Sequence, residues 1–166
     1  MKISIIIPCY NEVKTLNLIV EKIINKRNLD KEIIIVDDFS DDGTRDIIKN
    51  ELSEKVTKIL YNDKNYGKGY SVRKGISVST GDIVLIQDAD LEYSPDDYEK
   101  LLKPILDGHA DVVYGSRFKS SEITRVLYFW HTLGNKFLTL FSNMLTNFNL
   151  TDMENCYKVF KSDIIK

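Results

Sequence analysis

Short apolar runs rich in β-branched residues alternate with helix-like segments along most of this chain. Five of these runs are expected to be strands: Ile3–Pro8, Glu32–Val36, Val56–Tyr61, Ile83–Ile86 and Asp111–Ser116. Continuous apolar character is typical of parallel strands that are covered on both faces of a sheet. Strands that alternate with helices at this spacing predict an α/β fold, with an open, mostly parallel sheet flanked by helices.

The segments between the runs carry helix signals. The first expected helix opens at Asn11-Glu12, and its apolar residues follow the 3.6-residue period up to Ile24. Further helices are expected at 44 to about 52, 66–78 and 95 to about 106. A short strand is expected within the tail, 151–161.

One long amphipathic helix is expected from Glu122 to Phe148. Its apolar residues recur at steps of three and four and include Trp130, Phe137 and Met144, while Asn135 lies on the opposite, polar face. We interpret the apolar stripe as a face that packs into the core. Because the stripe is wide and rich in aromatic residues, an interfacial role at a membrane is the alternative.

Length and composition restrict the classes of function. With 166 residues, the chain is expected to form one domain, 1–166, that can bury a substantial core. A net charge of −2, with scattered Lys and Arg, argues against nucleic acid as the partner. Neither cysteine has metal-ligand or disulfide spacing, so a reduced, cytoplasmic protein is expected. No apolar stretch has the length of a membrane span.

Two aspartates follow the fourth expected strand, and ligands of open parallel sheets bind at the carboxyl ends of the strands. Asp88 and Asp90 are two residues apart, so their side chains share a face of extended chain and can converge. Mg²⁺ and similar ions take one or two carboxylates and complete their shell with water and phosphate oxygens. The pair therefore predicts a metal–diphosphate site. Helix capping, the other role for such acids, is assigned to Ser94.

Polar residues that follow the other expected strands should gather on the same rim. They are Tyr10, Asn11, Glu12, Asp37, Asp38, Glu92 and Arg117. Structural roles stay open for some of them, because Tyr10 and Glu12 can simply begin the first helix. Asp41 and Asp42 are interpreted as turn and cap residues, and the Gly67–Gly69 segment as a tight turn.

Six segments together resemble the family 2 glycosyltransferases, and among them the branch that uses dolichyl or polyprenyl phosphate. They are Ile-Pro-Cys-Tyr-Asn-Glu (7–12), Ile-Val-Asp-Asp-Phe-Ser-Asp-Asp-Gly-Thr (35–44), Asn-Tyr-Gly-Lys-Gly (65–69), Gly-Asp-Ile-Val-Leu-Ile-Gln-Asp-Ala-Asp-Leu-Glu-Tyr (81–93), Gly-Ser-Arg-Phe (115–118) and Asp-Met-Glu-Asn-Cys-Tyr-Lys-Val-Phe (152–160). The resemblance implies the GT-A fold, a nucleotide-sugar donor of the GDP-mannose or UDP-glucose type, and Mg²⁺ or Mn²⁺. It also implies inverting transfer to a lipid phosphate at a membrane surface, by a cytoplasmic protein that is peripheral to the membrane.

The resemblance further implies roles for single residues. Those for donor binding are Pro8, Tyr10, Glu12, Val36, Asp38, Asp88, Ala89, Arg117 and Lys158. Those for the metal are Asp88, Asp90 and Glu92, and those for catalysis are Asp90, Asp152 and Arg117. Members of the family often have Gln where this chain has Glu92, so an added negative charge is expected to change metal affinity or metal choice.

The chemistry of the acceptor leaves alternatives open. A lipid phosphate is largely dianionic at neutral pH and can attack without a protein base. A sugar hydroxyl of a cell-surface glycan needs a base, for which Asp152 or Glu154 is placed by its order in the chain. A non-catalytic nucleotide-sugar-binding domain is the other alternative. Many enzymes of this branch continue into extra helices or membrane spans, so a truncated form is also considered, and no oligomeric state is predicted.

Overall fold

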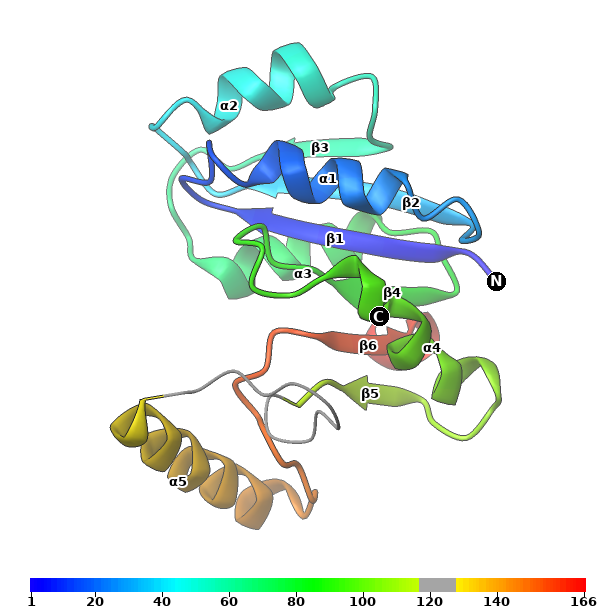
Figure 1. Cartoon of the computed structure of the whole chain (residues 1–166), viewed down its shortest axis with the longest axis vertical. Coiled ribbons are helices and arrows are strands. Elements are labelled where there is room, and N and C mark those ends of the chain that lie inside the picture. The colour runs from blue at the N-terminus through cyan, green and yellow to red at the C-terminus, as the bar shows by residue number, and fades with distance from the viewer. Residues whose placement is uncertain (117–127) are drawn as a thin grey trace.

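The computed structural model describes residues 1–116 and 128–166. Within them a six-stranded sheet has the order β3-β2-β1-β4-β6-β5 (Figure 1). The strands are β1 (Ile3–Cys9), β2 (Lys31–Asp37), β3 (Lys58–Tyr61), β4 (Ile83–Ile86), β5 (Val112–Tyr114) and β6 (Lys158–Lys161). The helices are α1 (Leu16–Ile24), α2 (Thr44–Ile47) with a π-helical turn (Ile48–Leu52), α3 (Lys68–Val78), a 3₁₀ turn (Pro95–Asp97) before α4 (Tyr98–Leu106), α5 (Phe129–Thr146) and α6 (Ser162–Ile165).

The predicted α/β fold with a mostly parallel sheet is confirmed. β1 pairs in parallel with β2 and β4, and β2 pairs in parallel with β3. β6 lies between β4 and β5 and is antiparallel to both, so it is the one reversed strand of the described sheet. Lys158, the first residue of β6, is therefore paired with Ile86 and Tyr114, which end β4 and β5. This reversal brings the segment before β6 to the carboxyl ends of the parallel strands.

Both faces of the sheet are covered, which explains the continuous apolar runs. Ile5 and Ile7 of β1 belong to a core cluster that includes buried residues of α1 and α4. Ile6 points the opposite way and clusters with Ile34 and Val36, against apolar residues of α3. These five side chains are fully buried, and each contributes roughly 1.5–3 kcal/mol to folding.

Element bounds differ from expectation where a loop has its own hydrogen bonds. The first helix begins at Leu16, and not at Asn11-Glu12. Asn11 has a left-handed φ of 57°, and its side-chain carbonyl accepts a 3.0 Å hydrogen bond from the amide of Asp41. The 11–15 segment is thus held against the loop after β2, which a helix starting at Asn11 would prevent.

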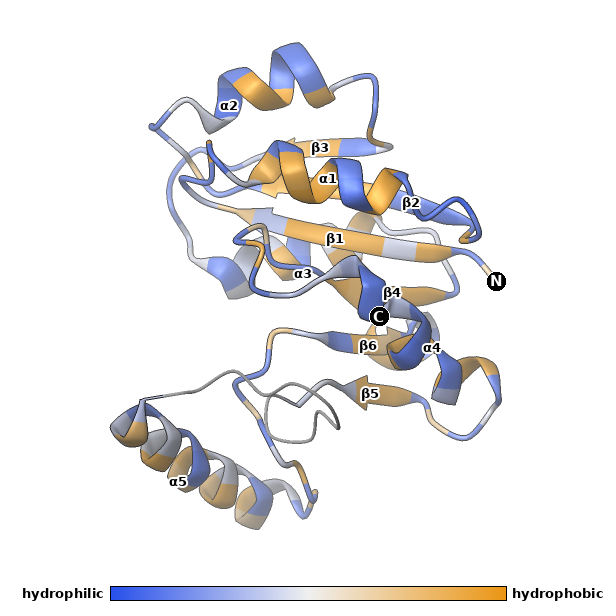
Figure 2. Ribbon diagram, in the orientation of Figure 1, coloured by the Kyte–Doolittle hydropathy of each residue, from blue (hydrophilic) through white to orange (hydrophobic). Residues whose placement is uncertain are grey.

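The interpretation of the long apolar stripe as a core-packing face is wrong. In α5 the side chains of Trp130, Phe137 and Met144 are 76%, 67% and 74% exposed, and the apolar side of the helix is visible in Figure 2. The buried residues of this helix are the polar Asn135 and Thr139. The start expected at Glu122 lies outside the described residues.

Candidate functional site

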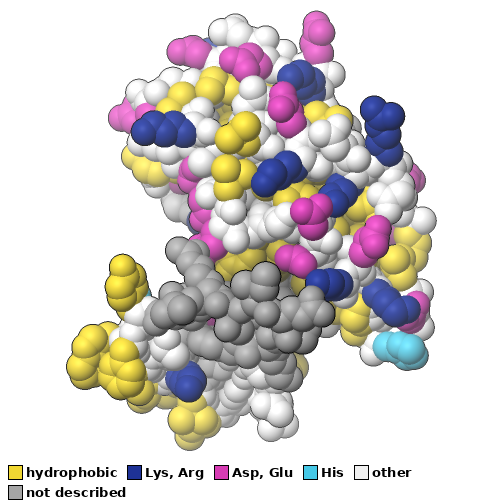
Figure 3. Space-filling view, viewed as in Figure 1, with side chains coloured by type: hydrophobic (Ala, Val, Ile, Leu, Met, Phe, Trp, Pro, Cys, Tyr) yellow, Lys and Arg dark blue, Asp and Glu magenta, His cyan; other side chains and the backbone are white. Residues whose placement is uncertain are grey.

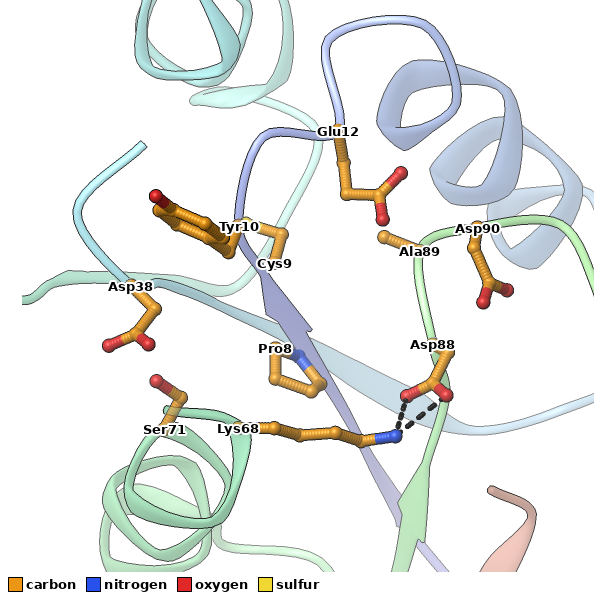
Figure 4. A pocket seen from close by; sticks show the side chains of 10 residues that line it. All are labelled: Pro8, Cys9, Tyr10, Glu12, Asp38, Lys68, Ser71, Asp88, Ala89 and Asp90. Carbon is orange, nitrogen blue, oxygen red and sulfur yellow. Dashed lines mark hydrogen bonds and ion pairs between the residues drawn. The ribbon is translucent and has the colours of Figure 1, made fainter. Parts of the chain in front are cut away.

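A cleft of about 290 Å³ opens at the carboxyl ends of β1, β2 and β4 and beside the start of α3. Its size is at the lower end of the range for small-molecule sites. Ten residues line it: Pro8, Cys9, Tyr10, Glu12, Asp38, Lys68, Ser71, Asp88, Ala89 and Asp90 (Figure 4). The structure thus brings together seven of the residues that the sequence singled out.

Three lining residues were not predicted, namely Cys9, Lys68 and Ser71. Cys9 is buried at the end of β1, and burial together with nearby carboxylates raises the pKa of its thiol. Lys68 is the first residue of α3, and Ser71 lies one turn further along the same helix. The sequence did carry a signal for this side of the cleft: a lysine at the start of a helix, directly after the polar loop that follows the third strand.

Glu12 has a structural role as well as a place in the cleft. Its carboxylate accepts a hydrogen bond from the hydroxyl of Thr15, and its carbonyl accepts one from the amide of Leu16 at the start of α1. Its own amide donates to Thr44, which begins α2, at 2.9 Å. Glu12 therefore joins the first and second loops of the rim.

Asp38 organises the loop between β3 and α3. Its carboxylate accepts hydrogen bonds from the amides of Tyr66 (3.0 Å) and Gly67 (2.7 Å) and from the side chain of Asn62 (2.6 Å). Burial alone would raise the pKa of Asp38, but these hydrogen bonds outweigh burial and lower it. Gly67 has a φ of 86°, which an L side chain rarely adopts, and it is the N-cap of α3, so the Gly67–Gly69 segment predicted as a tight turn is the start of this helix.

Asp88 and Lys68 form an ion pair across the cleft. The ammonium of Lys68 lies 2.6 Å and 2.7 Å from the two carboxylate oxygens of Asp88 (Figure 4). It also lies 3.4 Å from the thiol of Cys156, in the segment before β6. Burial would lower the pKa of Lys68, but the hydrogen bond and charge of Asp88 outweigh it and raise that pKa.

The charges of the cleft suit a divalent cation. Its lining side chains include four carboxylates, those of Glu12, Asp38, Asp88 and Asp90, and one ammonium, that of Lys68. A diphosphate alone would meet an excess of negative charge. Asp88 and Asp90 follow β4 on one loop and both face the cleft, which fits Mg²⁺ or Mn²⁺ with two protein ligands and the rest from water and phosphate. Among the described residues, no group of three or more His, Cys, Asp or Glu side chains is clustered as a metal site.

The other residues predicted for the site lie outside the lining of this cleft. Val36 is fully buried with its side chain in the core, so only its backbone could contact a ligand. Glu92 is exposed, and its amide donates a 2.9 Å hydrogen bond to Asp90. Arg117 lies outside the described residues.

Lys158, the first residue of the reversed β6, lies close enough to Asp88, Lys68 and Asp152 for their charges to act on it. The ammonium of Lys158 lies 5.3 Å from the ring centre of Tyr114, and burial lowers its pKa, while the charges of Asp88 and Asp152 act in the opposite direction. Because β6 is paired on both sides, Lys158 is not a lysine of an edge strand. Asp152 is 1% exposed and accepts a 2.8 Å hydrogen bond from Asn135.

Comparison with known proteins gives a consistent result. The family model described as "Glycosyl transferase family 2" matches residues 4–166. The chain is 35% identical over 119 residues to the dolichol-phosphate mannosyltransferase of Pyrococcus furiosus, an alignment that covers 71% of this chain and 34% of that relative. It is 31% identical to the UDP-N-acetylglucosamine–dolichyl-phosphate N-acetylglucosaminyltransferase of Methanococcus voltae, over 99% of this chain and 71% of that protein. The chain thus spans about a third of the length of the first relative.

The fold is shared with solved glycosyltransferase structures. Glucosyl-3-phosphoglycerate synthase from Mycobacterium tuberculosis, in complex with Mn²⁺, UDP-glucose and phosphoglyceric acid, superposes with a TM-score of 0.74 at 19% identity. The superposition covers 98% of this chain and 57% of the synthase. The GT-A fold implied by the sequence motifs is confirmed.

Proposed function

This chain belongs to glycosyl transferase family 2, and from that premise we propose that it transfers a sugar from a nucleotide-sugar donor to a polyprenyl phosphate. The two relatives described above carry names that share a dolichyl-phosphate acceptor and differ in the sugar. The proposal therefore specifies the class of acceptor and leaves the donor sugar open between mannose, glucose and acetamido sugars.

The observation that carries the proposal is the cleft with Asp88 and Asp90 at the carboxyl end of β4. These two side chains would hold Mg²⁺ or Mn²⁺, which supplies Lewis-acid stabilisation of the leaving nucleoside diphosphate. Pro8, Tyr10 and Asp38 line the part of the cleft after β1 and β2, where the nucleoside would bind. Lys158, together with Arg117, would bring positive charge to the diphosphate.

A phosphate acceptor agrees with the surroundings of the late acids. A lipid phosphate dianion needs no protein base, whereas a sugar hydroxyl must pass its proton to one. The carboxylate of Asp152 is buried and hydrogen-bonded to Asn135, and Glu154 is exposed. We assign Asp152 the role of positioning the segment before β6, on which Lys158 depends for its place.

The exposed face of α5 supports a place at a membrane surface. We define this apolar face as Trp130, Leu133, Phe137, Leu140, Phe141, Met144 and Leu145, all exposed. In Figure 3 hydrophobic side chains gather over α5, with a basic side chain beside them, whereas charges of both signs are mixed over the upper part of the molecule. The described residues contain no helix long and apolar enough to span a membrane. A helix with one polar side against the protein and one apolar side outward is suited to lie in the lipid interface, beside the lipid-linked acceptor.

Donor turnover tests the proposal directly. We expect release of nucleoside diphosphate that requires both Mn²⁺ or Mg²⁺ and a polyprenyl phosphate. Asp90→Asn should lose this activity, while Asp152→Asn and Glu154→Gln should keep enough to exclude either acid as an essential base. Loss of activity in Asp152→Asn that Asn135→Ala does not reproduce would favour a hydroxyl acceptor, because Asn135→Ala disturbs only the positioning contact of Asp152. Binding of the donor without release under any condition would favour a non-catalytic binding domain.

A further inference from the structure

Lys68 occupies the place of a cation on Asp88. Its ammonium is within 2.7 Å of both carboxylate oxygens, so both oxygens of Asp88 hold the same nitrogen. The side chain of Asp88 is 13% exposed and that of Lys68 is 50% exposed. Because a carboxylate that holds an ammonium with both oxygens cannot hold a metal ion with the same lone pairs, the two cations compete for Asp88.

Lys68 is placed so that it can leave Asp88 without leaving the cleft. Its backbone is fixed at the first position of α3, immediately after Gly67, whose amide is held by Asp38. Its side chain is long and half exposed, and its second contact, the thiol of Cys156 at 3.4 Å, is a weak acceptor. The N-terminus of α3 and the ammonium of Lys68 bring positive charge to this side of the cleft, whose other charged lining residues are carboxylates.

We propose that Lys68 is an exchange residue: it neutralises Asp88 while no donor is bound, and moves to the diphosphate when a divalent cation takes over Asp88. This inference rests on the proposed function, since it assumes a metal–diphosphate donor. The consequence is positive coupling between the two ligands. The cation alone must displace Lys68 from Asp88, but when it arrives with a diphosphate the displaced ammonium gains a new anionic partner. By linkage, each ligand then tightens the binding of the other by the same factor.

Binding measurements without turnover test this exchange. Mn²⁺ affinity is measured by electron paramagnetic resonance with and without GDP or UDP, in the wild type and in Lys68→Gln. We expect Mn²⁺ alone to bind about fivefold more tightly to Lys68→Gln, the scale of a partly exposed ion pair. We expect the nucleoside diphosphate, at saturating Mn²⁺, to bind about tenfold more weakly because a charge-assisted contact is lost. If Lys68 had only a structural role, Lys68→Gln would weaken the binding of both Mn²⁺ and the nucleoside diphosphate.

Two further variants keep the test specific. Lys68→Arg retains a bidentate partner for Asp88 and should bind Mn²⁺ with the affinity of the wild type. Lys64→Gln removes the same charge from an exposed lysine of the loop that precedes α3 and should change neither affinity. Unchanged or weaker Mn²⁺ binding in Lys68→Gln, or an equal effect in Lys64→Gln, overturns the exchange while the proposed function stands. If the wild type binds neither Mn²⁺ nor either diphosphate, the proposed function is wrong and the exchange with it.

Discussion

The side-chain amide of Asn135 in α5 donates a 2.8 Å hydrogen bond to the carboxylate of Asp152, in the segment before β6. The hydroxyl of Thr139, one turn along the helix, donates to the side-chain oxygen of Asn135 at 2.9 Å and accepts from the backbone amide of Met153 at 3.2 Å. Asn135, Thr139 and Asp152 are buried. Their hydrogen bonds attach the polar side of α5 to the protein, and as a result the apolar side of the helix is exposed.

Replacing Asn135 with Ala should affect transfer more than donor binding. Asp152 would lose a buried partner, so we expect about 1–3 kcal/mol lower stability in urea unfolding and a reduced transfer rate at saturating donor. Asn143→Ala is the matched control, because Asn143 also holds the end of α5, through Leu150, but does not touch Asp152. An equal loss of transfer in both variants would show that Asp152 has no positioning role.

The apolar face of α5 should determine binding to lipid vesicles. We expect the triple variant Trp130→Gln, Phe137→Ser and Met144→Gln to bind phosphatidylcholine vesicles that contain polyprenyl phosphate at least about tenfold more weakly, since each side chain loses the gain from leaving water. Unfolding should be almost unchanged, because these side chains are exposed. Co-sedimentation measures the bound fraction. The control replaces Leu106 and Ile164, which are exposed apolar residues elsewhere, with Ser and should bind like the wild type.

Glu32 should make the fold sensitive to acid. Burial alone would raise its pKa, but hydrogen bonds from Ser4, Thr80 and Lys2 outweigh burial and lower the pKa to about 2, from an ordinary value of 4.5. A carboxylate with a depressed pKa stabilises the fold above its unfolded pKa, and this contribution of about 3 kcal/mol is lost as the pH falls from about 4.5 to about 2.

Urea unfolding of the wild type and Glu32→Gln at several pH values checks this dependence. The difference in unfolding free energy between the two should be largest at neutral pH and should shrink below pH 4.5. Glu54→Gln, at an exposed position, should follow the wild type across the range. A difference that is independent of pH would mean that the charge of Glu32 is not what the network stabilises.

Asp38→Asn should loosen one wall of the cleft. The substitution would turn an amide donor toward the donor groups of Asn62, Tyr66 and Gly67, so we expect about 1–3 kcal/mol lower stability. Amide hydrogen exchange in the 62–67 loop should become faster, and nucleoside diphosphate affinity should fall. Asp41→Asn, at an exposed position in the loop after β2, is expected to change neither. Unchanged exchange in the 62–67 loop would contradict the organising role of Asp38.

Much of the fold and of the cleft could be predicted because it depends on local patterns. The bounds expected for β4, Ile83–Ile86, are those observed, because a short continuous apolar run between turn residues is typical of a buried strand. Parallel strands end on one edge, so residues that follow β1, β2 and β4, such as Tyr10, Asp38 and Asp88, had to gather there. The expected α1 started too early because the hydrogen bond between Asn11 and Asp41 joins residues 30 apart.

The sequence by itself therefore determined the strands, their common rim and the acids that line it. Only the tertiary structure decided three further matters: the insertion of reversed β6 between β4 and β5, the ion pair of Lys68 with Asp88, and the inward polar side of α5. Periodicity shows which residues share a face, but the partner of that face is chosen by contacts between distant segments. In α5, buried hydrogen bonds around Asp152 hold the polar side of the helix against the protein, although the apolar side of an amphipathic helix usually faces the core.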